Sequence, residues 1–323
     1  MASPLKQLRY RIEWLAIKLM SVVVPLLPRG GIQWLANALA FAAFRVDAEG
    51  RHTALANLNA VLGETHTEDQ RLEIAKQAYR DFARTMLDQF WSSRLNAENY
   101  LNHIEVVSED PEAIEQAKES GAIWISPHYG NFEWTSLVMG FRGFPFTVVA
   151  QDFKNPLLTD LFNSNREVSG HRVIPQNGAM LRLFKNLKAG GHAAFLTDLT
   201  IKPGRTATII DCFGLKTCVT TMHAGLQRKL QLPIIPGFTI PLPNGKYQLN
   251  ILAPLKLKDG ASDQEITQAC WDAFETHIKE NPTPWLWMYK HWRYRPEEGG
   301  DNYPPYAQIS SPFNKLEKSL KGS

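Results

Sequence analysis

A histidine and a glutamate lie five positions apart in the segment IWISPHYGNFEW, residues 123–134. An imidazole can take a proton from a hydroxyl group, and a neighbouring carboxylate can hold the ring and stabilise its charged form. On a continuous helix, His128 and Glu133 would diverge by about 140° around the axis and could not meet. Pro127 and the Gly-Asn pair after it interrupt the helix, so a loop can bring the two side chains together. The spacing therefore predicts that His128 is a base oriented by Glu133.

The same segment contains no side chain that would serve as a nucleophile. The chain has no G-x-S-x-G motif, and Ser126 lies on the strand side of Pro127. A base without an enzyme nucleophile can activate a substrate hydroxyl directly, which is the chemistry of an acyltransferase. On spacing alone, two polar residues at the end of a strand remain an equal alternative, because such a pair arises often by chance.

Strand and helix patterns alternate from residue 102 onward. This alternation predicts an α/β fold with a mixed, mostly parallel sheet flanked by helices. Reactive groups gather at the carboxyl ends of strands in such sheets, and His128 follows one of them. The expected strands are 103–108, 121–126, 145–150, 172–175, 192–196, 232–240 and 246–255. The expected helices are 67–91, 111–120, 133–139, 155–169, 179–189 and 220–229.

Two apolar segments, 12–27 and 32–44, precede this pattern and are joined by Pro-Arg-Gly-Gly. Pro25 interrupts the first, which falls short of the about 20 apolar residues that a spanning helix needs. Basic and tryptophan side chains in and around these segments favour a hairpin pressed into a membrane surface. A pair of core helices is the alternative, and a cleaved signal peptide is disfavoured because no cleavage site follows.

We therefore expect three parts: an N-terminal membrane-associated helical segment (1–50), a catalytic domain (51–297) and a C-terminal tail (298–323) that is loose or lies on the surface. The formal net charge of +3 is too small to indicate a nucleic-acid-binding protein. The three cysteines lack the spacing of a zinc site or a disulfide framework. No metal or cofactor is expected.

The segment HYGNFE resembles the H-x4-D/E block of the lysophospholipid and glycerol-phosphate acyltransferase superfamily. It is most similar to the HFGNWE-type block of the bacterial lipid A biosynthesis late acyltransferases, of lauroyl or myristoyl type. Further similar blocks follow in order along the chain, which makes the resemblance far more specific than one hexapeptide. They are NLNAVLGE, NPLLTDLFNSNREVSGHRVIP, LTDLTIKPGRTATIIDCFG and WLWMYKHWRYRP.

The resemblance implies a glycerol-phosphate acyltransferase-like fold and an inner-membrane enzyme that faces the cytoplasm. Such an enzyme moves a fatty acyl chain from acyl carrier protein to a hydroxyl of a lipid A precursor. His128 would be the base and Glu133 its orienting carboxylate. Arg166 would donate to the carbonyl oxygen that gains charge, and Asp198 matches an acidic block whose usual glutamine is replaced here by Leu199. A solvated arginine and a turn aspartate are the alternatives for the last two.

Four residues are candidate substrate ligands. Backbone N–H groups at Gly130 and Asn131 form an alternative set of donors to the same oxygen, although Asn131 could also be a cap. Lys202 and Arg205 lie in a loop and could meet phosphates, or could be merely solvated. The closing segment, Trp285 to Arg295, mixes aromatic and basic residues, which suits either a lipid interface or a packed helix. It departs from the family pattern at two positions.

Two rival functions remain open. The first is a related acyltransferase that uses acyl-CoA on another glycolipid, an aminolipid or a glycerolipid. The second is a non-catalytic membrane lipid-binding protein of the same fold. The retention of both His128 and Glu133 argues against the second. The sequence does not specify the acyl chain length, the acceptor hydroxyl or the donor.

Overall fold

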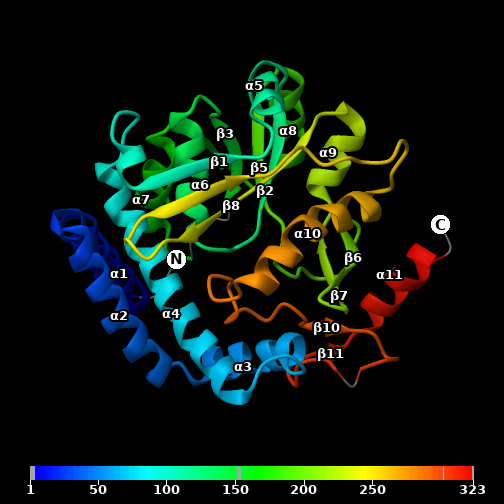
Figure 1. Cartoon of the computed structure of the whole chain (residues 1–323), viewed down its shortest axis with the longest axis horizontal. Helices are drawn as coiled ribbons and strands as arrows, with labels where there is room; N and C mark the ends of the chain where they lie inside the picture. The colour runs from blue at the N-terminus through cyan, green and yellow to red at the C-terminus, as the bar shows by residue number, and fades with distance from the viewer. Residues whose placement is uncertain (1–3, 151–153, 301, 322–323) are drawn as a thin grey trace.

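The computed structural model describes residues 4–150, 154–300 and 302–321, and its centre is a seven-stranded sheet (Figure 1). The strands of this sheet are β1 (Ile104–Ser108), β2 (Ala122–Ser126), β3 (Phe146–Ala150), β4 (Arg172–Pro175), β5 (His192–Leu196), β8 (Ile234–Pro241) and β9 (Tyr247–Ile251). Their order is β1-β9-β8-β2-β5-β3-β4, and only the β8–β9 pair is antiparallel. The predicted α/β fold with a mixed, mostly parallel sheet is confirmed.

Helices lie on both faces of this sheet. The helices of the described residues are α1 (Pro4–Val23), α2 (Arg29–Val46), α3 (Ala48–Leu62), α4 (Glu68–Trp91), α5 (Pro111–Ser120), α6 (Phe132–Phe141), α7 (Pro156–Glu167), α8 (Ala179–Lys188), α9 (Met222–Leu230), α10 (Asp263–Glu280) and α11 (Ser311–Lys321). Short 3₁₀ turns follow α1 and α4 and precede β1. The expected strands and helices are present with small shifts at their ends, because proline, glycine and capping residues mark those ends in the sequence.

Strand β2 shows why the sheet is covered on both sides. All five of its residues are buried, as expected for an inner parallel strand. Ile123 and Ile125 pack into one apolar cluster with α8, α9 and α10. Trp124 points the other way and packs with α5 and α6. Successive side chains of a strand alternate between faces, so this one strand anchors both layers.

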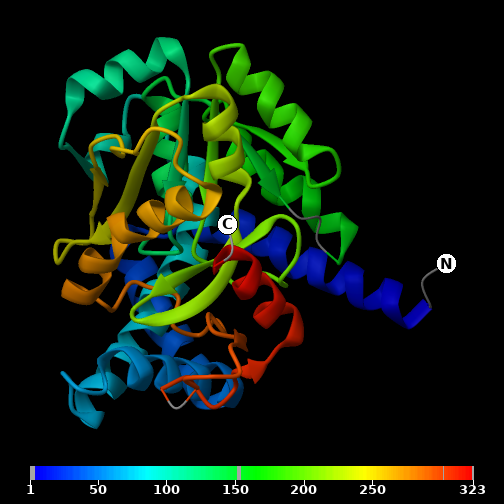
Figure 2. The ribbon, with the colours of Figure 1, turned by 90° about the vertical axis from the view of Figure 1, so that its right-hand side faces the viewer.

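A hairpin outside the main sheet was not expected from the sequence. It consists of β6 (Ala207–Cys212) and β7 (Leu215–Thr220), and it extends from the body toward α11 (Figure 2). The expected helix 220–229 begins two residues later than predicted, because Thr220 ends β7 and α9 begins only at Met222. The β-branched and cysteine residues of this stretch favour the extended form that the hairpin adopts.

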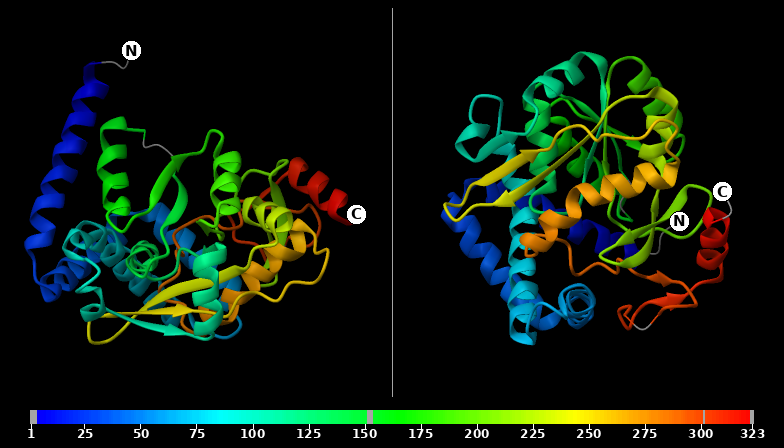
Figure 3. Two further views of the ribbon diagram at one scale, coloured as in Figure 1. Left: turned by 90° about the horizontal axis from the view of Figure 1, so that it is seen from above. Right: turned by 45° about the vertical axis from the view of Figure 1, so that its right-hand side comes forward.

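The N-terminal hairpin of helices packs against α4. The inner face of α2, with Ile32 and Ala36, joins the cluster that contains Phe90 and Trp91 of α4. Figure 3 shows α1 running along the edge of the molecule and extending beyond it toward the N-terminus. Within residues 4–150, 154–300 and 302–321, no helix combines the length and the apolar character needed to cross a bilayer.

The C-terminal tail is more ordered than expected. Strand β11 (Gln308–Ile309) pairs with β10 (Tyr294–Arg295), and α11 follows it. Phe313 of α11 is fully buried with Ala207, Ile209 and Cys218 of the β6–β7 hairpin. The high proportion of Pro, Gly and Ser before α11 suggested a tail that is loose or lies on the surface. Helix α11 lies on the hairpin, held by Phe313, by Leu316 and Leu320, and by an ion pair between Lys216 and Glu317.

Candidate active site

His128 and Asp198 are brought together by the register of two neighbouring strands. Strands β2 and β5 are parallel, and Ser126 is paired with Leu196. His128 and Asp198 each lie two residues beyond that pair, at the carboxyl ends of the strands. The Nδ1 atom of His128 is 2.7 Å from Oδ1 of Asp198. The backbone N–H of His128 also donates to the other carboxylate oxygen, at 2.9 Å.

The environment of Asp198 keeps its carboxylate ionised. Burial alone would raise its pKa, but the charge and hydrogen bond of His128, with further help from His291 and Trp285, lower it to about 2. A negative carboxylate at Nδ1 makes that nitrogen the donor, so the lone pair of the ring resides on Nε2. This is the arrangement of a general base whose charged form is stabilised by a buried partner.

The tryptophan-rich segment after α10, residues 285–295, covers the buried side chain of Asp198. Trp285 donates its indole N–H to Oδ2 of Asp198 at 2.9 Å, and its ring stacks on His291 with centroids 4.0 Å apart. Trp285, Trp287 and Trp292 are all almost fully buried. These three tryptophans therefore do not form a lipid interface, and the segment is a chain of turns rather than a helix.

The predicted pairing of His128 with Glu133 is wrong. Glu133 lies in the first turn of α6, and its two oxygens accept from Arg166 of α7 at 3.0 and 2.6 Å. The ring nitrogen that Glu133 was expected to hold is held by Asp198. Burial opposes the charge of Arg166, but the Glu133 carboxylate outweighs it and raises the pKa of the guanidinium. Glu133 therefore positions Arg166, with which it shares a bidentate ion pair.

Gly130 and Asn131 form the turn between the base and α6. Gly130 has φ of +58°, and its N–H donates to the carbonyl of Pro284 at 3.0 Å. Asn131 is fully buried and caps α6, since its side-chain oxygen accepts from the backbone N–H of Trp134. Their contacts are those of a loop-forming glycine and a helix cap. The Gly130 N–H of the predicted donor pair is already engaged by Pro284.

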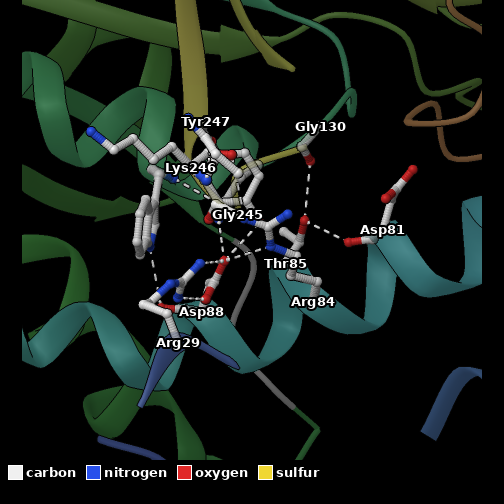
Figure 4. Close-up of polar contacts among 12 residues, drawn as sticks. Arg29, Asp81, Arg84, Thr85, Asp88, Gly130, Gly245, Lys246 and Tyr247 are labelled. Atoms are coloured by element: carbon white, nitrogen blue, oxygen red, sulfur yellow. Dashed lines mark hydrogen bonds and ion pairs between the residues drawn. The ribbon is translucent and has the colours of Figure 1, made fainter. Parts of the chain in front are cut away.

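A buried carboxylate that the sequence analysis missed supports this turn from α4. Asp88 is fully buried and accepts from Asn131, from the Tyr247 hydroxyl and from both terminal nitrogens of Arg29 (Figure 4). Next to it on α4, the Thr85 hydroxyl donates to the carbonyl of Gly130 at 3.2 Å. Helix α4 thus ties the turn to α2 and β9. Sequence alone gives little signal for this, because an acid inside an amphipathic helix usually faces solvent.

Comparison with known proteins identifies the family. Residues 2–294 match the profile of the family described as "Bacterial lipid A biosynthesis acyltransferase". The chain belongs to this family. The resemblance inferred from its sequence blocks is therefore confirmed. The match includes His128, Glu133, Arg166 and Asp198.

Individual relatives in the bacterial lipid A biosynthesis acyltransferase family are distant. A "Lipid A biosynthesis acyltransferase" of Haemophilus influenzae is 23% identical over 197 residues, which cover 59% of this chain and 60% of that protein. A "Phosphatidylinositol mannoside acyltransferase" of Mycobacterium tuberculosis is 25% identical over 176 residues, covering 53% and 54%. The chain thus matches between half and two thirds of the length of these relatives, and the lipids in their names differ.

Two of the predicted substrate ligands, Lys202 and Arg205, are exposed, unlike the buried Asp198. Lys202 and Arg205 are exposed in the loop between β5 and β6, four and seven residues after Asp198. Their proposed contact with phosphates stays a prediction. The loop leaves the carboxyl end of β5, so it starts at the same edge of the sheet as the base.

Proposed function

We propose that the protein is a membrane-associated O-acyltransferase. It transfers a fatty acyl chain from an acyl carrier protein thioester to a hydroxyl of a lipid A precursor. The observation that carries this proposal is the hydrogen bond from Nδ1 of His128 to the buried carboxylate of Asp198. That bond leaves Nε2 as a base, and the family assignment supplies the reaction class.

The reaction proceeds by direct attack of the acceptor. Nε2 of His128 removes the hydroxyl proton as the oxygen attacks the thioester carbonyl carbon, and Asp198 stabilises the imidazolium. The resulting tetrahedral intermediate collapses by breaking the C–S bond. The imidazolium returns its proton to the leaving sulfur, which departs as the thiol. The products are an ester and the free carrier thiol, and the enzyme is unchanged.

The burial of the three cysteine thiols and of the Ser126 hydroxyl argues for direct attack by the acceptor rather than for an acyl-enzyme intermediate. Cys212, Cys218 and Cys270 are buried, and burial raises the pKa of each thiol. The Ser126 hydroxyl is buried and donates to the carbonyl of Pro127. These groups are therefore poor nucleophiles, because a reactive cysteine needs an accessible thiolate.

Arg166 is the proposed donor to the oxyanion. Glu133 occupies two of its N–H groups, and an arginine has five, so others remain to meet a carbonyl oxygen. The Arg166 side chain is 30% exposed to solvent. A guanidinium fixed by a bidentate ion pair is preorganised, which is what stabilisation of a developing oxyanion requires.

Membrane attachment through the N-terminal helices is supported by an exposed stripe on α1. The stripe consists of apolar side chains at intervals of three and four residues, namely Leu5, Leu8, Ile12, Leu15, Leu19, Val22 and, just beyond α1, Leu26. Lys6, Arg9, Arg11 and Lys18 lie on the same helix, whose single acid is Glu13. An apolar face beside basic residues fits the cytoplasmic surface of the inner membrane.

Mass spectrometry of lipids from cells that lack or overproduce the protein tests the acceptor. We expect a mass difference of one acyl group on a lipid A species. If the mass difference were confined to another glycolipid, that glycolipid would be the acceptor instead of the lipid A precursor. Unchanged lipids would contradict acyl transfer. Assays with purified protein and matched acyl carrier protein and CoA thioesters test the donor, and a preference for CoA would contradict the proposed carrier.

A further inference from the structure

A groove on the N-terminal half of the molecule is separate from the candidate active site. It encloses about 990 Å³ among α2, α3 and α4. His128, Asp198, Glu133 and Arg166 are not among the residues that line it. A space of this size matches a small ligand or a lipid headgroup. Its charged lining residues are Arg45, Arg51, Lys76, Arg80, Arg84 and Asp81.

Five cations and one carboxylate give this groove an excess of positive charge. Arg45 and Arg80 are both exposed, and neither forms an ion pair within the described parts of the chain. The Arg45 guanidinium lies over the Phe41 ring, and Arg80 donates to the side chain of Gln77. Uncompensated arginines gathered around a concave surface attract anions.

The base of the groove contains two buried charged residues, Arg84 and Asp81, and each has one polar atom without a hydrogen-bond partner among the described residues. Arg84 is only 8% exposed and donates to the Gly245 carbonyl (Figure 4). Among the described residues, its Nε has no hydrogen-bond partner, and the nearest carboxylate oxygen, on Asp88, is 3.8 Å away. Oδ2 of Asp81 likewise has no hydrogen-bond partner there. The unpaired N–H of Arg84 is a buried donor that an anionic ligand would satisfy, whereas the unpaired oxygen of Asp81 is an acceptor and opposes an anion.

We propose that this groove binds a phosphate-bearing ligand of headgroup size, held by the guanidinium groups of Arg45, Arg51 and Arg80. Planar guanidinium groups match phosphate oxygens in a bidentate geometry that a lysine cannot reproduce. Arg84 adds positive charge from below. Lys76 is ion-paired with Glu73, and Arg84 lies 3.8 Å from a carboxylate oxygen of Asp88. The groove remains cationic even when Asp81 is ionised, because Arg45, Arg51 and Arg80 form no ion pair within the described parts of the chain.

Exposed aromatic side chains on α2 favour a lipid as the source of the phosphate. Phe41 lines the groove and is 62% exposed, and Trp34 lies two helical turns earlier on the same side of α2 and is 71% exposed. A lipid would place its phosphate on the arginines and its glycerol and first methylenes on these rings. A soluble phosphate compound would use the arginines alone.

Calorimetric titration of the full-length protein tests this inference. The probes are dihexanoylphosphatidylglycerol below its micellar concentration and inorganic phosphate, so that adsorption of α1 to vesicles does not contribute. The test variant is R45Q/R80Q, whose two side chains are exposed and can change without disturbing the core. We expect it to weaken binding of the short lipid by roughly tenfold or more.

Three further variants make the result specific. R228Q/K229Q removes two exposed cations from α9, far from the groove, and should bind like the wild type. D81N removes the only acid of the lining and should bind more tightly. H128A should keep full binding although acyl transfer is lost, which separates this inference from the proposed function.

The outcomes distinguish the possible ligands. Binding of inorganic phosphate as tightly as the short lipid, with loss in R45Q/R80Q, would support the groove and assign it to a soluble phosphate compound. Equal loss in R45Q/R80Q and R228Q/K229Q would indicate non-specific charge attraction and overturn the inference. Failure of the wild type to bind either probe would also overturn it.

Discussion

His128 and Asp198 are hydrogen-bonded at 2.7 Å although they are 70 residues apart in the sequence. Their proximity follows from the pairing of Ser126 with Leu196, since each residue lies two positions beyond its partner in that pair. The carboxylate that holds Nδ1 of His128 therefore comes from the neighbouring strand, and the nearby Glu133 pairs with Arg166. One strand register thus sets the geometry of the whole site.

The first prediction concerns Asp198→Asn. The amide keeps the size of the side chain but removes the charge that stabilises the imidazolium and fixes its tautomer. We expect kcat for acyl transfer to fall by roughly a hundred- to ten-thousand-fold, with the unfolding midpoint followed as the check on folding. Activity within a few-fold of the wild type would exclude Asp198 as the orienting group. Asn at this position can still accept from Trp285, so the enclosure should survive.

The strands and helices that were predicted from the sequence are present because their ends are marked locally, although α3 and α10 were not predicted. Helix α5 begins at Pro111 and ends before Gly121, and α4 begins after a Thr67 capping box. These signals act over a few residues, so they can be interpreted without knowledge of the rest of the fold. The hairpin β6–β7 lacked such a signal, and Thr220 at its end was assigned to the predicted helix 220–229.

The partner of His128 could not be predicted from spacing. That assignment depends on which strands are neighbours and on their register, and both are properties of the whole sheet. Glu133 was chosen because it is near in sequence, whereas Asp198 was selected only through the family resemblance. The aromatic segment around Trp285 was likewise interpreted from its composition, which does not distinguish a buried tryptophan from one at a membrane surface.

A double-mutant cycle should reveal the coupling of Glu133 and Arg166. Because Glu133 acts by holding the guanidinium, E133Q and R166Q should each lower kcat, and the double variant should be little worse than either single one. R166K keeps the charge without the bidentate fork and should recover only part of the loss. Steady-state kinetics of the wild type and these four variants check this. Losses that add in free energy would show that the two residues act independently.

Replacing Gly130 by Ala should disrupt the turn between the base and α6. A Cβ at this position would overlap the carbonyl oxygen of Thr239, and φ is +58°. Gly178 offers a matched control, because its φ is +69° and a Cβ there would meet nothing within 4 Å. We expect G178A to cost about 1–2 kcal/mol for the left-handed backbone. G130A should cost clearly more and also abolish acyl transfer.

Urea unfolding and single-turnover assays compare the two glycine variants. Equal stability losses would mean that the loop around Gly130 relaxes away from Thr239. In that case the close approach of the turn to β8 would not be required for activity. Far-ultraviolet circular dichroism of both variants ensures that the comparison is made between folded proteins.

His223 should make the protein less stable as the pH falls. It is fully buried, and burial lowers its pKa to about 4, with an opposing influence from Asp263. The unfolded chain takes up a proton near pH 6.5, whereas the folded chain does so near pH 4, so acid favours unfolding between these values. The loss is on the order of 3 kcal/mol when the protonation difference is complete. Urea unfolding from pH 7 to pH 4 measures it.

The variant His223→Leu tests the origin of that pH dependence. Neither ring nitrogen of His223 has a hydrogen-bond partner among the described residues, so an apolar side chain of similar volume should not leave a polar group unpaired. We expect H223L to flatten the slope of unfolding free energy against pH in this interval. If the slope of unfolding free energy against pH did not change in H223L, titratable groups other than His223 would cause the acid sensitivity.

The apolar stripe of α1 should determine binding to anionic membranes. Substituting Ile12 and Leu19 by glutamine removes two members of the stripe without altering the face of α1 that packs on α7. Each buried aliphatic side chain contributes about 1.5–3 kcal/mol, so partial insertion of two predicts at least roughly tenfold weaker binding to vesicles that contain an anionic lipid. Co-sedimentation with vesicles measures this, and L101Q/V107Q removes two exposed apolar residues elsewhere as the control.

The same stripe could in principle pair with α1 of a second copy, because its spacing of three and four residues matches a coiled-coil seam. The charges beside it argue for the membrane. Arg9, Arg11 and Lys18 flank the seam, so two such helices would bring like charges together, whereas an anionic surface attracts them. Vesicle binding should accordingly weaken as salt is raised. Binding that resists salt, together with a dimer that I12Q/L19Q dissociates, would assign the stripe to self-association instead.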